Sequence, residues 1–171
     1  MKKLPRSFYL RPTIQVARDL LGKLIVRRYR DRFIIGKIVE VEAYLGAVDP
    51  ASHAYRGMTK RNEVMFGQGG HLYVYFTYGM HFCANVVTRK QGVGEAVLLR
   101  AVGPVKGIAT MAKNRGKSVS SKGLTNGPAK FCQAFGIARK ENGTDLLGST
   151  IFITKGKKIP GYLISRAHSC Q

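Results

Sequence analysis

Acidic residues are scarce in this sequence. Nine Asp and Glu stand against 29 Lys and Arg, which gives a formal net charge of +20 over 171 residues. Such an excess indicates a polyanionic partner, either nucleic acid or an acidic membrane surface. Because 44% of the residues are apolar, a disordered basic tail is excluded. The length predicts a single domain over residues 1–171 with a core of its own.

Long apolar runs are also missing. No stretch is long enough to span a bilayer, and no apolar segment follows Lys2 and Lys3 as it would in a secretion signal. We therefore expect no membrane partner and a soluble, monomeric nucleic-acid-binding protein. It would be cytoplasmic and associated with the nucleoid in a bacterium, or nuclear in a eukaryote.

The chain has few potential metal ligands or disulfides. Its three cysteines show no CxxC spacing, and their odd number argues against a disulfide framework, which fits a reducing compartment. Four histidines are scattered along the chain. His71 and His81 straddle one predicted hairpin, where the pattern allows them to meet. With no Cys or acidic residue beside them, surface histidines are favoured over a metal site.

Two of the scarce carboxylates fall in one stretch, residues 34–44, with the sequence IIGKIVEVEAY. Its alternation predicts a strand. One face would carry Ile35, Lys37, Val39, Val41 and Ala43, and the other Ile38, Glu40, Glu42 and Tyr44. Carboxylates at the apolar-flanked end of a strand are costly to desolvate. We therefore interpret this strand end as the candidate active site, with Glu42 as its first carboxylate.

The first part of the chain predicts a helix and a hairpin. Thr13 is expected to cap a helix that Gly22 ends. A strand over residues 24–29 and a turn at residues 30–32 would then lead into the 34–44 strand as a hairpin.

Residues 45–70 predict a long irregular loop, punctuated by Gly, Pro, Ser and Asn. A loop of that length in a compact domain is usually functional. It carries groups of the kinds that stack on bases and bind phosphates, namely His53, Tyr55, Arg56, Lys60, Arg61 and Asn62.

Residues 71–85 predict a second hairpin, with Tyr78-Gly79-Met80 at its tip. A tip is normally polar, so a Tyr and a Met are unusual there. The pattern leaves two alternatives open: the tip offers both side chains to solvent, or it folds back under the neighbouring loop.

The remaining elements follow in order. A strand is predicted over residues 96–102, with Arg100 in the middle of an apolar run. An arginine in that position needs a partner, such as Glu42 or Glu40. The alternative is an edge strand from which Arg100 reaches out to solvent. Pro104 is expected to start one helix, and Asn126-Gly127-Pro128 to open another over residues 129–138. The start of that helix, with Lys130, is either an anion site or an ordinary helix start. Residues 151–154 predict a short strand.

Several of these segments together resemble the alkyladenine (3-methyladenine) DNA glycosylase family. They are VEVEAYLG, His53, KRN at residues 60–62, LYVYFTYGMHFCAN, VLLRA and NGPAKFCQA, in an order and spacing that match over about residues 17–154. The resemblance implies a mixed α/β fold: one domain built on a curved, mainly antiparallel sheet, flanked by helices and carrying a protruding β-hairpin.

The resemblance also implies a function. Such enzymes repair DNA by flipping an alkylated purine out of the duplex and hydrolysing its N-glycosidic bond. The expected substrates are 3-methyladenine and 7-methylguanine in double-stranded DNA, with hypoxanthine and ethenoadenine left open. An alkylated purine carries a positive charge, so one carboxylate and a water suffice, and aromatic walls favour the cation. No metal or organic cofactor is expected. No lysine is marked as a nucleophile, which implies a monofunctional glycosylase.

The roles that the resemblance implies are specific to positions in this chain. Glu42 matches the general base that activates water, and Arg100 matches the arginine that holds this water. Tyr44, His53 and Tyr75 match the residues that enclose the flipped base, and Asn85 the position that crowds the 2-amino group of guanine. Tyr78 matches the side chain that fills the gap in the duplex, with Met80 beside it, and Arg61 and Lys130 are expected at the DNA backbone.

The chain departs from the family pattern at its C-terminal end. The family's chains continue past the segment at residues 164–171, and the further residues supply a backbone group to the water site and a closing strand. We therefore expect either a shortened homologue or a truncated gene product. The alternatives are a non-catalytic, structure-specific nucleic-acid-binding protein and a small RNA-binding protein of ribosomal type. The first leaves Glu42 without a role, and the second leaves the acidic strand end unexplained.

Overall fold

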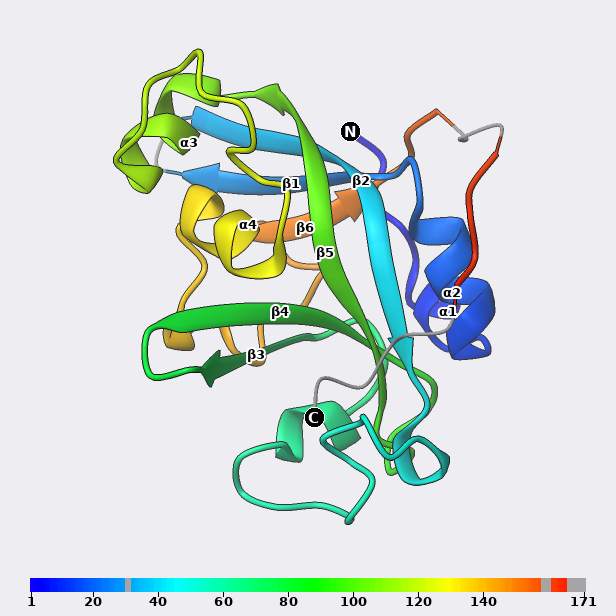
Figure 1. Cartoon of the computed structure of the whole chain (residues 1–171). Coiled ribbons are helices and arrows are strands. Elements are labelled where there is room, and N and C mark those ends of the chain that lie inside the picture. Colours follow the sequence, from blue (N-terminus) through cyan, green and yellow to red (C-terminus); the bar gives the residue numbers. More distant parts are fainter. Residues whose placement is uncertain (30–31, 158–160, 166–171) are drawn as a thin grey trace.

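Six antiparallel strands form one curled sheet in the computed structural model, which describes residues 1–29, 32–157 and 161–165 (Figure 1). Their order across the sheet is β3-β4-β5-β2-β1-β6. The strands are β1 (Leu24–Tyr29), β2 (Arg32–Tyr44), β3 (Leu72–Thr77), β4 (His81–Thr88), β5 (Glu95–Lys106) and β6 (Ile151–Thr154). The mixed α/β class with a mainly antiparallel sheet is thus confirmed.

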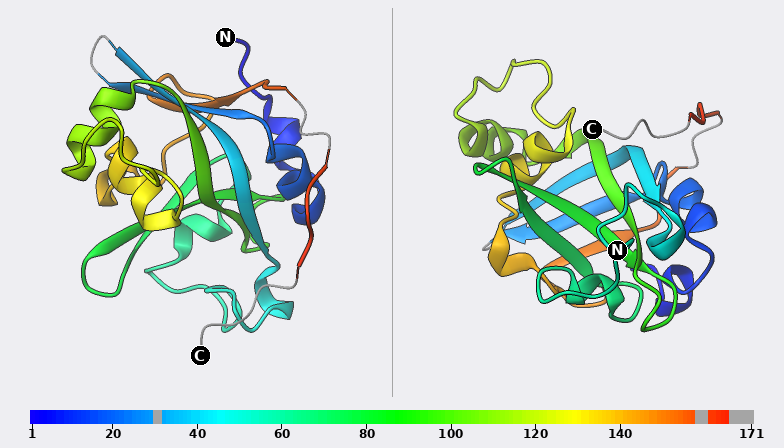
Figure 2. Two further views of the ribbon diagram at one scale, coloured as in Figure 1. Left: turned by 45° about the horizontal axis from the view of Figure 1, so that its top comes forward. Right: turned by 60° about the horizontal axis from the view of Figure 1, so that its bottom comes forward.

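Neighbouring strands along the chain pair as hairpins, as the sequence predicts. β1 pairs with β2, and β3 with β4, while the predicted turn residues 30 and 31 lie outside the described residues. The pairing between the two longest strands, β2 and β5, joins the two halves of the sheet. Figure 2 shows the resulting curl, which brings β3 and β4 across from β1 and β6.

Helices cover the sheet on two sides. They are α1 (Arg6–Tyr9), α2 (Thr13–Leu20), α3 (Ile108–Arg115) and α4 (Pro128–Phe135), with 3-10 turns η1 (Gly46–Val48), η2 (Glu63–Phe66) and η3 (Arg139–Glu141). The main core contains Leu20 of α2, Ile38 and Leu99 of the sheet, and Phe131 and Phe135 of α4. Within the described ranges, no helix has the length and apolar character needed to cross a membrane.

Thr13 does not cap α2, contrary to the prediction. The helix is preceded by Pro12, and no side chain bonds to its first backbone amides. The Thr13 side chain is buried instead, where its hydroxyl lies 2.7 Å from the hydroxyl of Thr88 and bonds to Glu95. Its hydrogen bonds therefore tie the helix to the sheet.

The two C-terminal helices differ from prediction at their ends. Pro104 does not begin a helix, because β5 continues through it and pairs it with Gly36 of β2. β4 pairs with β5 no further than Leu98, so the other side of β5 at Pro104 has no strand that needs an N–H group. Helix α4 ends at Phe135 rather than 138, because Gly136 takes a left-handed φ of 64° and its N–H bonds back to the last turn.

The two histidines of the second hairpin do not meet. His81 lies beside the turn, opposite Thr77, whereas His71 precedes the other end of β3 and bridges to Asp145. The predicted tip at residues 78–80 already implies this arrangement, because a hairpin closed there pairs residue 81 with residue 77 and leaves residue 71 at the far end.

Candidate active site

The Glu42 carboxylate is held at both oxygens. Nη1 of Arg100 donates to Oε1 at 2.8 Å, and the hydroxyl of Tyr44 donates to Oε2 at 2.8 Å. Arg100 also donates from Nε to Oε1 of Glu40 at 2.8 Å, so the expected partnership with Glu42 or Glu40 is confirmed for both. The Glu42 side chain is still 23% exposed, which leaves room for a water molecule to reach it.

A strand irregularity sets the direction of Glu42. Ile38 belongs to the main core, and Val41 packs against the same core. In a strictly alternating strand, two residues that are three positions apart lie on opposite faces. Strict alternation across residues 34–44 is therefore wrong, and Ile38 does not share a face with Glu42. The register with β5 shifts on each side of Glu40, which has the effect of a β-bulge. Past this point the core-facing side of the strand is reversed, so Glu42 turns away from the core.

Charge and burial fix the protonation states around the carboxylate. The pKa of Tyr44 is raised by burial, and further by its hydrogen bond to Glu42 and the negative charge there. The phenol therefore stays protonated and can donate. The pKa of Arg100 is raised chiefly by the charge of Glu42, so the guanidinium stays cationic.

A small cavity adjoins Tyr44. Its lining residues are Tyr44, Ala51, His53, Met65, Tyr73, Tyr75 and Asn85. The four residues that the resemblance places around a flipped base are all among them. The cavity volume is about 40 Å³, which holds water but is far below the roughly 300 Å³ of an ordinary ligand site. A purine would have to displace the cavity walls to enter.

His53 lies against two tyrosines of β3. Its Nδ1 is 3.1 Å from the hydroxyl of Tyr73, and its ring meets the ring of Tyr75 edge-on at 4.4 Å. Tyr73 was not among the predicted site residues. The signal for it was present, because alternation places Tyr73 and Tyr75 on the same side of the strand.

His53 favours its neutral form. Part of the residue is exposed, but the packed ring loses enough solvent that desolvation lowers its pKa, and the positive charge of Arg61 lowers it further. Burial likewise raises the pKa of Tyr73 to about 12. At neutral pH the cavity therefore presents uncharged hydrogen-bonding groups.

Asn62 organises the loop that carries His53. It is 3% exposed, and its Nδ2 donates to the carbonyl oxygens of His53 at 2.8 Å and Gly57 at 3.1 Å. Its Oδ1 accepts from the backbone N–H of Thr59 at 2.6 Å. The sequence predicts that Asn62 is among the residues that stack on bases or bind phosphates. The structure contradicts this, because the side-chain amide is buried and hydrogen-bonded to the backbone of its own loop.

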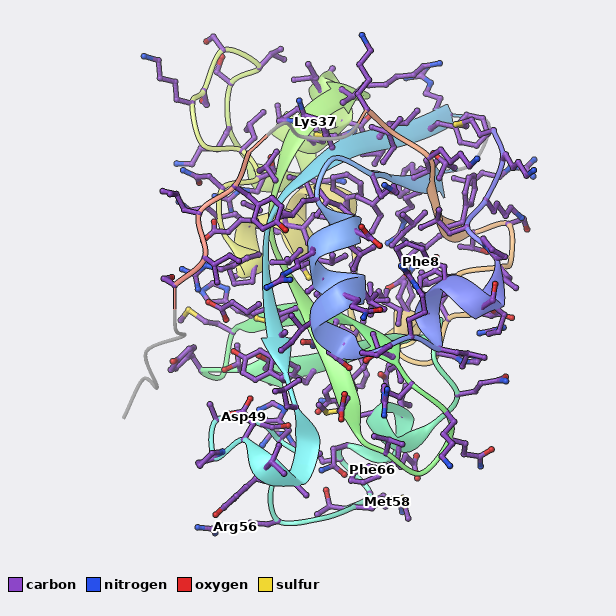
Figure 3. All side chains as sticks on the ribbon, turned by 90° about the vertical axis from the view of Figure 1, so that its right-hand side faces the viewer. Phe8, Lys37, Asp49, Arg56, Met58 and Phe66 are labelled. Carbon is purple, nitrogen blue, oxygen red and sulfur yellow. The ribbon has the colours of Figure 1, made fainter. Side chains whose placement is uncertain are left out.

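The expected DNA-backbone cations lie on separate elements. Arg61 is exposed and donates from Nη2 to the carbonyl oxygen of Phe76 on β3 at 3.2 Å. Arg56 and Met58 lie at the far end of the same loop, away from the sheet (Figure 3). Lys130 is exposed in the first turn of α4. Neither Arg61 nor Lys130 contacts Glu42, so any joint role requires a ligand that spans these elements.

The hairpin tip points into solvent. Tyr78 is 81% exposed and Met80 is 70% exposed, so the alternative of a folded-back tip is wrong. Tyr78 and Gly79 both have a left-handed φ, of 50° and 64°. That conformation is natural for glycine but costs another residue about 1–2 kcal/mol. An aromatic residue is therefore kept at a strained and exposed position.

A larger cavity, of about 510 Å³, lies elsewhere. Its lining is Leu4, Pro5, Ser7, Phe8, Arg11, Lys23, Lys155 and Gly156, which includes no carboxylate and none of the predicted site residues. Residues 1–29, 32–157 and 161–165 contain no group of three or more His, Cys, Asp or Glu side chains placed to hold a metal ion. The candidate site is therefore assigned from its chemistry and not from cavity size.

The arrangement suits one class of reaction. A carboxylate that water can reach, fixed beside an arginine and next to an aromatic cavity, is suited to hydrolysis at a bond adjoining an aromatic base. The strongly basic composition fits a nucleic-acid substrate. These features point to a hydrolase that acts on nucleic acid.

Comparison with known proteins makes the assignment specific. A family model described as methylpurine-DNA glycosylase matches residues 7–168, a wider span than residues 17–154. A protein of Carboxydothermus hydrogenoformans named "Putative 3-methyladenine DNA glycosylase" is 57% identical over 157 residues, covering 91% of this chain and 81% of its own. Proteins of the same name from Chlorobaculum tepidum and Clostridium acetobutylicum are each 47% identical, covering 96% and 91% of this chain and 78% and 80% of theirs.

The chain belongs to the methylpurine-DNA glycosylase family. Membership makes it a DNA glycosylase, a hydrolase of N-glycosyl bonds that serves DNA repair.

Proposed function

We propose that this protein removes alkylated purines, such as 3-methyladenine and 7-methylguanine, from double-stranded DNA by means of a water molecule that Glu42 activates. The observation that carries the proposal is the Glu42 carboxylate, fixed by Arg100 and Tyr44 next to the cavity of aromatic residues. The names of the relatives support the choice of substrate class.

The proposed hydrolysis needs one carboxylate and one water molecule. Glu42 accepts a proton from water as the water oxygen bonds to C1′ of the sugar. The bond from C1′ to the purine breaks, and its electron pair leaves with the base. That pair neutralises the positive charge of a 3- or 7-alkylated purine, so the base leaves without a protein acid. Arg100 holds the carboxylate and offers further N–H groups to the water.

Base flipping accounts for the cavity and the hairpin. A flipped purine would lie against Tyr44, His53 and Tyr75, whose aromatic faces favour a cationic base. Because the cavity is small, part of the binding energy must move its walls, and a distorted or unpaired base costs less to extrude. Tyr78, at the exposed tip, would fill the space that the base leaves.

The proposal is tested by base release from alkylated duplex DNA under single-turnover conditions. Wild-type protein should release 3-methyladenine. Glu42→Gln keeps the shape and hydrogen bonding of the side chain but removes the base, so it should bind the same DNA and lose about 10²–10⁴ in rate.

The matched control is Glu63→Gln. This exposed carboxylate of η2 makes the same change in charge without touching Arg100. It should leave the rate close to that of the wild type. A Glu42→Gln variant as fast as this control would rule out Glu42 as the base, and a wild type that binds DNA but releases nothing would favour the non-catalytic alternative.

A further inference from the structure

Arg100 is clamped between two carboxylates through different nitrogens. Nε donates to Glu40 and Nη1 donates to Glu42, each at 2.8 Å. A guanidinium is planar and carries five N–H groups in a fixed arrangement. One hydrogen bond leaves the group free to rotate about its side-chain torsions, whereas two bonds at separate nitrogens fix both its plane and its direction.

Both contacts are made from a segment of β2 that is irregular in its pairing with β5. Glu40 stands between two of the three register shifts of β2 against β5, in the segment where the core-facing side changes. In a regular strand the two carboxylates would lie about 6–7 Å apart along one face. The Arg100 side chain spans them from the neighbouring strand, so the two act on one guanidinium.

We propose that Glu40 is a positioning residue: it orients Arg100, and Arg100 in turn orients the Glu42 carboxylate and the water that Glu42 activates. This inference rests on the proposed function of Glu42. It assigns a role to the second carboxylate of the strand, which touches neither the cavity lining nor the reacting atoms.

Exposure separates this role from a role in stability. The side chains of Glu40 and Arg100 are 54% and 43% exposed. Ion pairs as open as this contribute little to folding, because solvent screens them. The contact at Nε therefore has its main effect on geometry, and its loss should be seen in the rate rather than in the melting temperature.

Two substitutions test the contact. In Glu40→Gln the amide oxygen still accepts from Nε of Arg100, so single-turnover base release should stay within about threefold of wild type. Glu40→Ala removes the acceptor, and the misdirected guanidinium should slow release by about 10- to 100-fold, with lesion affinity and melting temperature little changed. Both variants change the net charge equally, so charge alone cannot separate them.

A double-mutant cycle locates the effect. If Glu40 acts through Arg100, then Glu40→Ala should cause no further loss in an Arg100→Ala background. Asp19→Ala is the matched control, because it breaks another exposed arginine–carboxylate pair of 2.8 Å, with Arg11, away from the site. It should leave release unchanged.

The outcomes separate this inference from the proposed function. Equal rates for Glu40→Ala and wild type, or a full additional loss in the Arg100→Ala background, would overturn it while Glu42 kept its role. If the wild type releases no base, the proposed function fails, and the hydrogen bond between Arg100 Nε and Glu40 is tested by NMR of the Nε–H proton. Solvent exchange of this proton should be slow in wild type and Glu40→Gln but fast in Glu40→Ala. Equal exchange in all three proteins would show that Glu40 does not hold Arg100.

Discussion

Replacing Tyr78 by asparagine should make the protein more stable and worse at recognising damage. The tip residues Tyr78 and Gly79 both have a positive φ, the conformation that Asn-Gly adopts most readily in hairpin turns. A tyrosine there costs about 1–2 kcal/mol, of which asparagine should recover about 1 kcal/mol without the extra chain freedom of glycine. The side chain is 81% exposed, so little packing is lost.

The expected magnitudes are measurable. For a domain of this size, about 1 kcal/mol corresponds to a rise of about 2–4 °C in melting temperature. An aromatic side chain stacked against bases contributes about 1–3 kcal/mol. Its loss should therefore weaken binding to a lesion-bearing duplex by roughly 5- to 150-fold. Calorimetry gives the first quantity, and fluorescence anisotropy with lesion and undamaged duplexes gives the second.

Arg89 supplies the matched control. In the part of the chain that the structure describes, Tyr78 and Arg89 are the non-glycine residues with a positive φ, and the φ of Arg89 is 68°. Arg89→Asn should also raise the melting temperature, while the ratio of lesion to undamaged affinity stays unchanged. The reasoning is refuted if Tyr78→Asn lowers the melting temperature, or if it leaves that affinity ratio at the wild-type value.

Three further predictions concern the cavity and the charge. NMR should show that the pKa of His53 lies below its ordinary value near 6.5, and that Arg61→Gln moves it upward. Because the folded state disfavours the protonated imidazole, the contribution of His53 to stability falls as pH drops through 6.5. A measured pKa above 6.5 would contradict the prediction. Asn85→Ser should raise release of 7-methylguanine relative to 3-methyladenine on the order of tenfold, and an unchanged ratio would remove Asn85 from specificity. Log affinity for undamaged duplex should fall against log salt with a slope of about −0.9 per phosphate contacted, whereas a flat plot would contradict nucleic-acid binding.

Local patterns in the sequence predicted the elements well. Alternation located the strands, the two hairpins and the carboxylate end of β2, because these depend on neighbouring residues. The pairing of β2 with β5 could be anticipated only at one point, from the need of Arg100 for a partner. The remaining order of the sheet depends on contacts between distant segments, which local periodicity does not encode.

The errors have a common physical origin. Thr13 has the chemistry of a cap, and Asn62 that of a phosphate ligand, yet both side chains are buried and bonded within the protein. Sequence gives the hydrogen-bonding capacity of a polar residue but not the partner that takes it up. The bulge near Glu40 was likewise hidden, because an alternating sequence does not show where two strands slip in register.

The outer edge of β3 carries a risk of a different kind. Near its start the edge is covered by residues 142–144, since the N–H of Leu72 bonds to the carbonyl oxygen of Thr144 and the N–H of Val74 bonds to the Asn142 side chain. Towards the tip, the exposed side chain of Arg61 donates to the carbonyl oxygen of Phe76 on this edge. Open strand edges invite pairing with other copies and aggregation.

The net charge of +20 opposes that outcome, since equally charged copies repel one another. If the hairpin contacts DNA as proposed, the cations that attract DNA also keep its open edge from pairing with other copies of the protein. Salt screens both effects, so we predict that storage at high ionic strength weakens binding to DNA and favours self-association through this edge.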